Sequence, residues 1–126
     1  MIDFQSSSVF KLKPIDNEDA KDDFQKFLID GEEIVGTFKT VRDQVVFTNK
    51  RIIAANVQGI TGSKVDYTSI PYAKVQTFSI ETSGTFDRDT EVEIYISAVG
   101  KVRFEISGSF DILTFNKVIS DYVLSK

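Results

Sequence analysis

The sequence predicts a mainly β domain in which antiparallel strands are closed by a C-terminal helix. Two observations support this fold class: apolar and polar residues alternate between residues 33 and 107, and helical spacing returns over residues 109–125. A third segment, residues 16–30, also has helical spacing. We therefore expect one domain over residues 1–126, with an N-terminal arm and helix to about residue 31, a sheet core and a C-terminal helix.

The N-terminal arm carries scattered apolar residues and is expected to pack on the rest of the protein. Asp16 follows Pro14 and is a good N-cap for the predicted helix, and Gly31 is a good C-cap. The apolar face of this helix is formed by Ala20, Phe24, Phe27 and Leu28. At the other end of the chain, Ser109 is a candidate cap for the C-terminal helix, with Asp111 in the first turn.

Turn residues divide the sheet region into seven predicted strands. Alternation is clearest in its second half, where the apolar residues are expected to face one core shared with the C-terminal helix. The predicted core comprises Phe78, Ile80, Val92, Ile94, Ile96, Phe104, Ile106, Ile112, Phe115 and Ile119.

Two strands in the first half do not alternate. Residues 45–47 and 52–55 are apolar at every position, so each predicted strand has two apolar faces. An antiparallel strand with one face in water should alternate, so these strands need cover on the second face. The sequence leaves two sources of cover open, namely the N-terminal helix or a neighbouring subunit.

Composition excludes several classes of function. The chain has no His and no Cys, which removes the commonest general base and metal ligand, disulfides and thiolate chemistry. A net charge of −4 disfavours nucleic-acid binding and simple docking on anionic lipid. With no predicted membrane span and no signal peptide, we expect a cytoplasmic protein without enzyme activity, metal or cofactor.

Three stretches together resemble the bacterial pleckstrin-homology-like (PH-like) family. They are Thr48–Ile53, then Tyr67–Tyr72 followed by Val75 and Phe78–Glu81, and finally Thr82–Glu91. The predicted helix at 16–30 matches the usual start of the family. The resemblance implies a PH-like fold, with seven antiparallel strands, a C-terminal amphipathic helix and an additional N-terminal helix. Family members look like homo-oligomers that close into rings, and they resemble binding or scaffold modules rather than enzymes.

Two groups of residues are candidates for contact with a partner. Phe86, Asp87, Arg88 and Asp89 lie in the longest predicted loop, where an Arg between two Asp fits either an interface or a local ion-pair network. Tyr72 and Tyr95 are amphipathic and could line a groove, although such tyrosines more often cover the edge of a core.

A lipid-binding alternative depends on basic residues at the first two predicted hairpins. These residues are Lys39, Arg42, Lys50 and Arg51, and they lack the Lys/Arg-x-Arg group that lipid-binding PH domains share. The leading prediction is a self-associating binding or scaffold domain that recognises a peptide or protein. The alternative is a peripheral domain that binds phosphoinositides or other anionic lipids.

Overall fold

The computed structural model describes residues 9–82, 90–108 and 111–125. It is mainly β, with an eight-stranded sheet, a C-terminal helix and a short N-terminal helix, which confirms the predicted fold class. In chain order the elements are β1 (Val9–Ile15), the 3-10 turn η1 (Asn17–Asp19), α1 (Asp22–Phe27), β2 (Ile34–Lys39), β3 (Gln44–Thr48), β4 (Arg51–Gln58), β5 (Lys64–Pro71), the 3-10 turn η2 (Tyr72–Lys74), β6 (Thr77–Glu81), β7 (Thr90–Ile96), β8 (Gly100–Ile106) and α2 (Ile112–Leu124).

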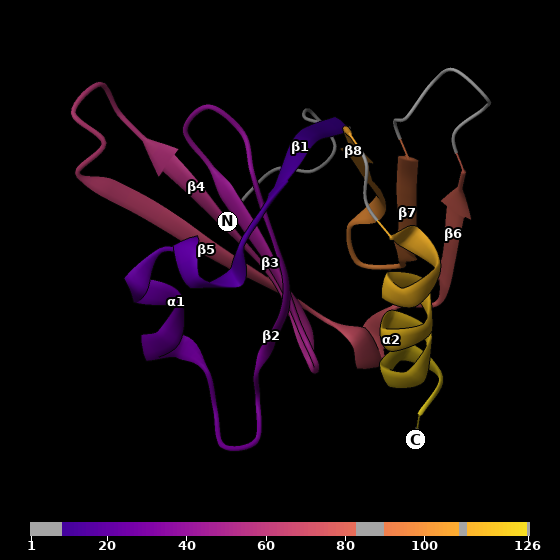
Figure 1. Cartoon of the computed structure of the whole chain (residues 1–126). Helices are drawn as coiled ribbons and strands as arrows, with labels where there is room; N and C mark the ends of the chain where they lie inside the picture. The colour runs from indigo at the N-terminus through magenta and orange to yellow at the C-terminus, as the bar shows by residue number, and fades with distance from the viewer. Residues whose placement is uncertain (1–8, 83–89, 109–110, 126) are drawn as a thin grey trace.

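The strands are ordered β5-β4-β3-β2-β1-β8-β7-β6 across the sheet. The strands β2 to β8 correspond to the seven predicted strands. The N-terminal arm adds an eighth strand, β1, which pairs antiparallel with β2 through residues 13–15 and parallel with β8 through residues 9–12. It therefore joins β2–β5 to β6–β8, and Figure 1 shows β1 between these two groups of strands.

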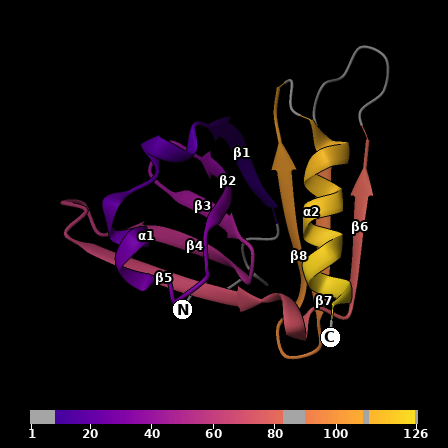
Figure 2. The same cartoon turned by 60° about the horizontal axis from the view of Figure 1, so that its bottom comes forward.

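The main core lies between the two groups of strands, with α2 beside β6–β8 (Figure 2). All ten predicted core residues belong to it, seven of them buried and Phe78, Ile80 and Ile112 partly buried against the others. At its centre, Phe47 packs edge-to-face on Phe104 and Phe115, with ring centroids 5.6 and 4.9 Å apart. The predicted register of β7 and β8 is therefore confirmed.

The N-terminal helix is shorter than predicted. Instead of one helix over residues 16–30, η1 and α1 are separated by an extended backbone at Ala20 and Lys21, and α1 ends at Phe27. The contacts that replace the missing turns are tertiary: Asn17 Oδ1 accepts a hydrogen bond from Thr37 Oγ1 at 2.9 Å, and Lys21 N donates to Gln44 Oε1 at 2.8 Å. Local helical preference is weak, and contacts with the sheet override it here.

The predicted helix caps also need correction. Asp16 precedes η1 but makes no capping hydrogen bond through its side chain. Gly31 has a φ of +78° in the connection to β2 rather than at a helix end. The N-cap of α2 is Asp111, whose Oδ1 accepts a hydrogen bond from Thr114 N at 3.2 Å, while Ser109 lies outside the described residues.

Candidate functional site

The basic residues predicted at the first hairpins divide between the two ends of β3. Lys39 pairs with Gln44 at the start of β3, and Arg42 lies in the turn before it. Lys50 and Arg51 follow Thr48, at the opposite end of the same strand. The fold therefore does not bring these four residues together as one basic patch.

We use the name hairpin end for the part of the molecule formed by the β2–β3 turn, the β4–β5 loop and the start of β1. The β2–β3 turn and the β4–β5 loop contact each other, because Arg42 Nη2 donates a hydrogen bond to the Gly59 carbonyl at 2.5 Å. Both lie at the top of Figure 1. Each carries one fully exposed aliphatic side chain, Val41 in the first and Ile60 in the second.

The opposite end of β3 holds a buried ion pair. The side chain of Glu32 is completely buried, and its carboxylate accepts hydrogen bonds from Arg51 Nε at 2.9 Å and Thr48 Oγ1 at 2.6 Å. The same Arg51 guanidinium donates to the Phe27 carbonyl at 2.6 Å. Arg51, a lipid-binding candidate from the sequence, therefore joins the end of α1 to the β3–β4 turn.

The electrostatics of Glu32 follow from these contacts. Burial opposes the charged carboxylate, but the hydrogen bonds from Arg51, Thr48 and the Ile29 amide together outweigh burial and lower the pKa of Glu32. The carboxylate is thus fully partnered and charged at neutral pH. This arrangement stabilises the fold and leaves no polar group of Glu32 for a substrate.

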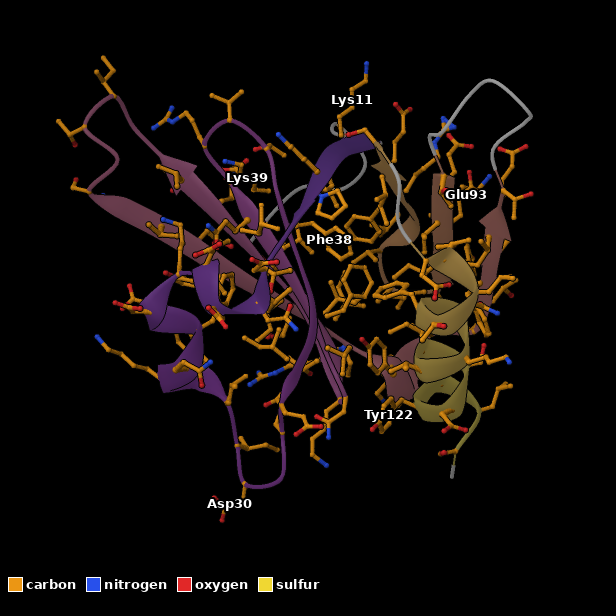
Figure 3. All side chains as sticks on the ribbon, viewed as in Figure 1. Lys11, Asp30, Phe38, Lys39, Glu93 and Tyr122 are labelled. Carbon is orange, nitrogen blue, oxygen red and sulfur yellow. The ribbon has the colours of Figure 1, made fainter. Side chains whose placement is uncertain are left out.

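Tyr72 lies in the core rather than in a surface groove, which agrees with the commoner of the two roles considered for it. Only 2% of its surface is exposed, and its hydroxyl donates to the Thr48 carbonyl at 2.8 Å. Burial raises its pKa. Its ring stacks on Tyr122 of α2, which Figure 3 labels at the lower end of the helix.

Tyr95 is exposed on the outer face of β7, where most neighbours are charged. On the same face Arg103 lies 3.5 Å from Glu91 and 3.8 Å from Glu93. A hydrogen bond with Glu81 raises the pKa of Glu91. A surface cavity of about 470 Å³ is lined there by Ser79, Ile80, Glu81, Glu91 and Glu93. Tyr95 thus belongs to a charged, solvated face.

The remaining predicted site, Phe86 with Asp87, Arg88 and Asp89, lies outside the described residues. Among the residues that are described, no group of three or more acidic side chains could hold a metal ion. Neither of the helices in this part of the chain is long and apolar enough to cross a membrane.

Sequence reasoning missed Glu32, Val41 and Ile60. Val41 and Ile60 could have been noticed in the sequence, because each is an aliphatic residue in a turn or a Gly-rich loop, where polar residues are the rule. Glu32 had no such signal, since its partners lie 16 and 19 residues away in the sequence.

Several bacterial proteins are similar to this chain. The chain is 47% identical over 77 residues to the uncharacterized protein YjqA of Bacillus subtilis (strain 168), and 39% identical over 66 residues to the uncharacterized protein YozO of the same strain. These matches cover 61% and 52% of this chain, and 62% and 57% of the relatives, so they span less than two thirds of each relative.

Solved structures match over more of the chain. A protein with a pleckstrin-homology domain from Shewanella loihica PV-4 is 32% identical, with a TM-score of 0.74, and the match covers 90% of this chain and 97% of that one. A pleckstrin homology domain from Shewanella amazonensis SB2B is 38% identical, with a TM-score of 0.62 and coverage of 88% and 90%. The model of the family described as "Bacterial PH domain" matches residues 3–123. The chain belongs to the bacterial PH domain family.

Proposed function

We propose that this chain is a non-catalytic binding module that assembles with copies of itself and holds a protein or peptide partner. The observation that carries the proposal is an apolar flank on α2. Leu113 and Leu124 are 67% and 69% exposed. They are eleven residues apart, close to three helical turns, so they lie on the same flank of the helix.

A second copy of the chain fits this flank. If two α2 helices pack antiparallel about a two-fold axis, Leu113 of each copy meets Leu124 of the other. Lys117 of each copy then lies opposite Ser120 and near Asp121 of the other, so the charges between the leucines are complementary. A two-fold contact must be self-complementary in this way.

The flank is also hollowed between its side chains. A surface cavity of about 550 Å³ lies along it, lined by Asn116, Lys117, Ser120, Asp121, Leu124 and Ser125. One two-fold contact produces a dimer, whereas the ring expected from the family resemblance needs a head-to-tail contact between two different surfaces. The sheet supplies a further surface, because β6 is its last strand and an edge strand can pair with an extended peptide.

Light scattering coupled to size exclusion tests self-association. We expect the parent at micromolar concentration to have at least a dimer mass, and Leu113→Ser/Leu124→Ser to have a monomer mass with unchanged thermal melting. The matched control is Val41→Ser/Ile60→Ser, which removes two exposed aliphatic side chains elsewhere and should keep the parent mass. A monomeric parent would reject self-association, and an α2 variant with the parent mass would reject this surface.

A further inference from the structure

The two edges of the sheet differ in how they are protected against pairing with another chain. β5, at one edge, carries Lys64, Asp66 and Pro71. Charged residues and proline are common means of keeping an edge strand from accepting a further strand. β6, at the other edge, contains no lysine and no proline, and it pairs with β7 without a bulge. The β6 edge is therefore the less protected of the two.

The backbone and the inner face of β6 are both incompletely used by the fold. In the described part of the chain β7 is the one strand that pairs with β6, so the other side of its backbone has no strand partner. On the inner face, Phe78 and Ile80 are only partly buried against the main core. A further strand would continue the sheet and cover the exposed part of these two side chains.

Three glutamates form one row across the outer face of β6–β8. Glu81 lies opposite Glu91, and Glu91 lies opposite Glu105. Like charges directly opposite each other destabilise a sheet. Arg103 lies 3.5 Å from Glu91, whereas no basic residue in the described part of the chain forms an ion pair with Glu81. The row therefore carries uncompensated negative charge at the β6 edge.

The opposite side of this group of strands shows what such a row accepts. There β1 of the same chain is added to β8 as a further strand, with Lys11 opposite Glu105 and Leu12 opposite Ile106. Leu12 is buried in the main core, whereas Lys11 is exposed. A strand in which apolar and basic residues alternate thus pairs with β8. The β6 edge offers the same two features, a core face and a glutamate.

We propose that the β6 edge binds an extended segment of another protein in which apolar residues alternate with lysine or arginine. The apolar side chains would pack beside Phe78 and Ile80, and the basic side chains would lie beside Glu81 on the outer face. Main-chain hydrogen bonds give affinity in this mode of recognition, and the alternate side chains give specificity. The inference rests on the proposed binding function and adds the chemistry of the partner, but it does not depend on the α2 contact.

Fluorescence anisotropy with a labelled seven-residue peptide tests the inference. In the probe lysine alternates with valine. Two control peptides contain the same residues, one with its lysines grouped at one end and one with every peptide nitrogen methylated. We expect the full chain to bind the probe about tenfold more tightly than either control, because the first cannot place its lysines on one face of a strand and the second cannot donate main-chain hydrogen bonds.

Two variants with the same change of charge locate the site. Glu81→Lys places a like charge beside the lysines of the probe and should weaken binding about tenfold. Glu18→Lys, at an exposed position in η1, is the matched control and should bind and melt like the parent. Amides of β6 should exchange with solvent more slowly when the probe is bound, while those of β5 keep their rate. Figures 1 and 2 show β6 and α1, which follows η1, on opposite sides of the molecule.

Three outcomes would overturn the inference: no binding of the probe by the parent, equal binding of the peptide with grouped lysines, or equal binding by Glu81→Lys. A parent mass that falls when the probe is added would also overturn it, because the β6 edge would then be a contact between copies. Leu113→Ser/Leu124→Ser should bind the probe like the parent whatever its mass. A parent of at least dimer mass that binds no probe would reject this inference alone, whereas a monomer that binds the probe would support it and reject only self-association.

Discussion

The outer faces of the two groups of strands differ: one is polar and exposed, and the other is apolar and covered. In β7 buried and less buried residues alternate, and its outer face carries Glu91, Glu93 and Tyr95. In β3 the last four residues are all buried. The outer face of β3 and β4 contributes Val46, Ile53 and Ala55 to a second apolar cluster, and α1 covers this cluster with the fully buried Phe24.

This difference resolves the alternative that the sequence left open. The two-faced strands receive their cover from the N-terminal segment of the same chain, with Ala20 and Leu28 packed beside Phe24. Those strands therefore provide no argument for assembly. Exposed aliphatic side chains remain on the α2 flank, at the hairpin end and, with Ile29, just after α1. Figures 1 and 2 show α2 and α1 far apart on the molecule.

Alanine substitutions should separate the two clusters most clearly. Phe104→Ala opens the main core between the two groups of strands, and we expect it to cost about 3–5 kcal/mol. Phe24→Ala empties the smaller cluster, where α1 can move to fill part of the space, so about 2–3 kcal/mol is expected. Chemical denaturation measures both values, with Phe27→Ala at a half-exposed site as the control. Equal losses for Phe104 and Phe24 would show that the two clusters act as one core.

Removing the charge of Glu32 should have the next largest effect. Glu32→Gln leaves Arg51 without its buried partner, and we expect a loss of about 2–3 kcal/mol at neutral pH. Because this ion pair joins the end of α1 to the β3–β4 turn, amides in α1 should exchange with solvent faster than those in β8. Uniform acceleration across the chain would argue that Glu32 supports the whole fold rather than the attachment of α1.

The same ion pair predicts a pH dependence. The pKa of Glu32 is lowered in the folded chain from its ordinary value of 4.5, so the unfolded chain binds the proton more readily. Its stabilising contribution is therefore present above that ordinary value and is lost as the pH falls through the lower, folded value. The difference in stability between the parent and Glu32→Gln should shrink on acidification in that range. A difference that stays constant would mean that Glu32 is not ionised in the folded state.

A smaller effect is expected at Gly36 in β2. A Cβ at this position would lie 3.1 Å from Phe115 Cε1 and 3.2 Å from Phe38 Cε2, which is closer than comfortable packing. We expect Gly36→Ala to cost about 1–2 kcal/mol through this overpacking of the main core. Thermal melting measures the loss, and an unchanged melting temperature would show that the two rings can move aside freely.

Regular alternation made most of the sheet predictable, and the core residues of β7 and β8 follow directly from it, whereas those of α2 follow from helical spacing. The N-terminal segment was harder. Pairing of β1 with β8 depends on residues far apart in the sequence, such as Ser107 and Leu12, which are 95 residues apart and are joined by the hydrogen bond from Ser107 N to the Leu12 carbonyl. Local spacing does not indicate such contacts. The acidic first turn and apolar spacing predicted a long helix, but contacts with Thr37 and Gln44 divide it.

Candidate site residues were less predictable than the fold. Spacing in sequence grouped Lys39 and Arg42 with Lys50 and Arg51, although β3 separates them. For Tyr72 the sequence left a groove and the edge of the core open, because the partner of its hydroxyl, the Thr48 carbonyl, is 24 residues away. The exposed leucines of α2 could have been found from the helical spacing alone, since the buried stripe of Phe115 and Ile119 leaves Leu113 and Leu124 on another flank.

Disulfide cross-linking at α2 tests the proposed assembly most directly. The chain has no cysteine, so Ser120→Cys introduces a single thiol near the predicted two-fold axis, and Ser79→Cys places one on the exposed outer face of β6 as a control. Under mild oxidation we predict a covalent dimer for Ser120→Cys, and little or none for Ser79→Cys at the same concentration. Equal cross-linking of the two variants, or none for Ser120→Cys in a sample with at least dimer mass, would contradict an antiparallel α2 contact.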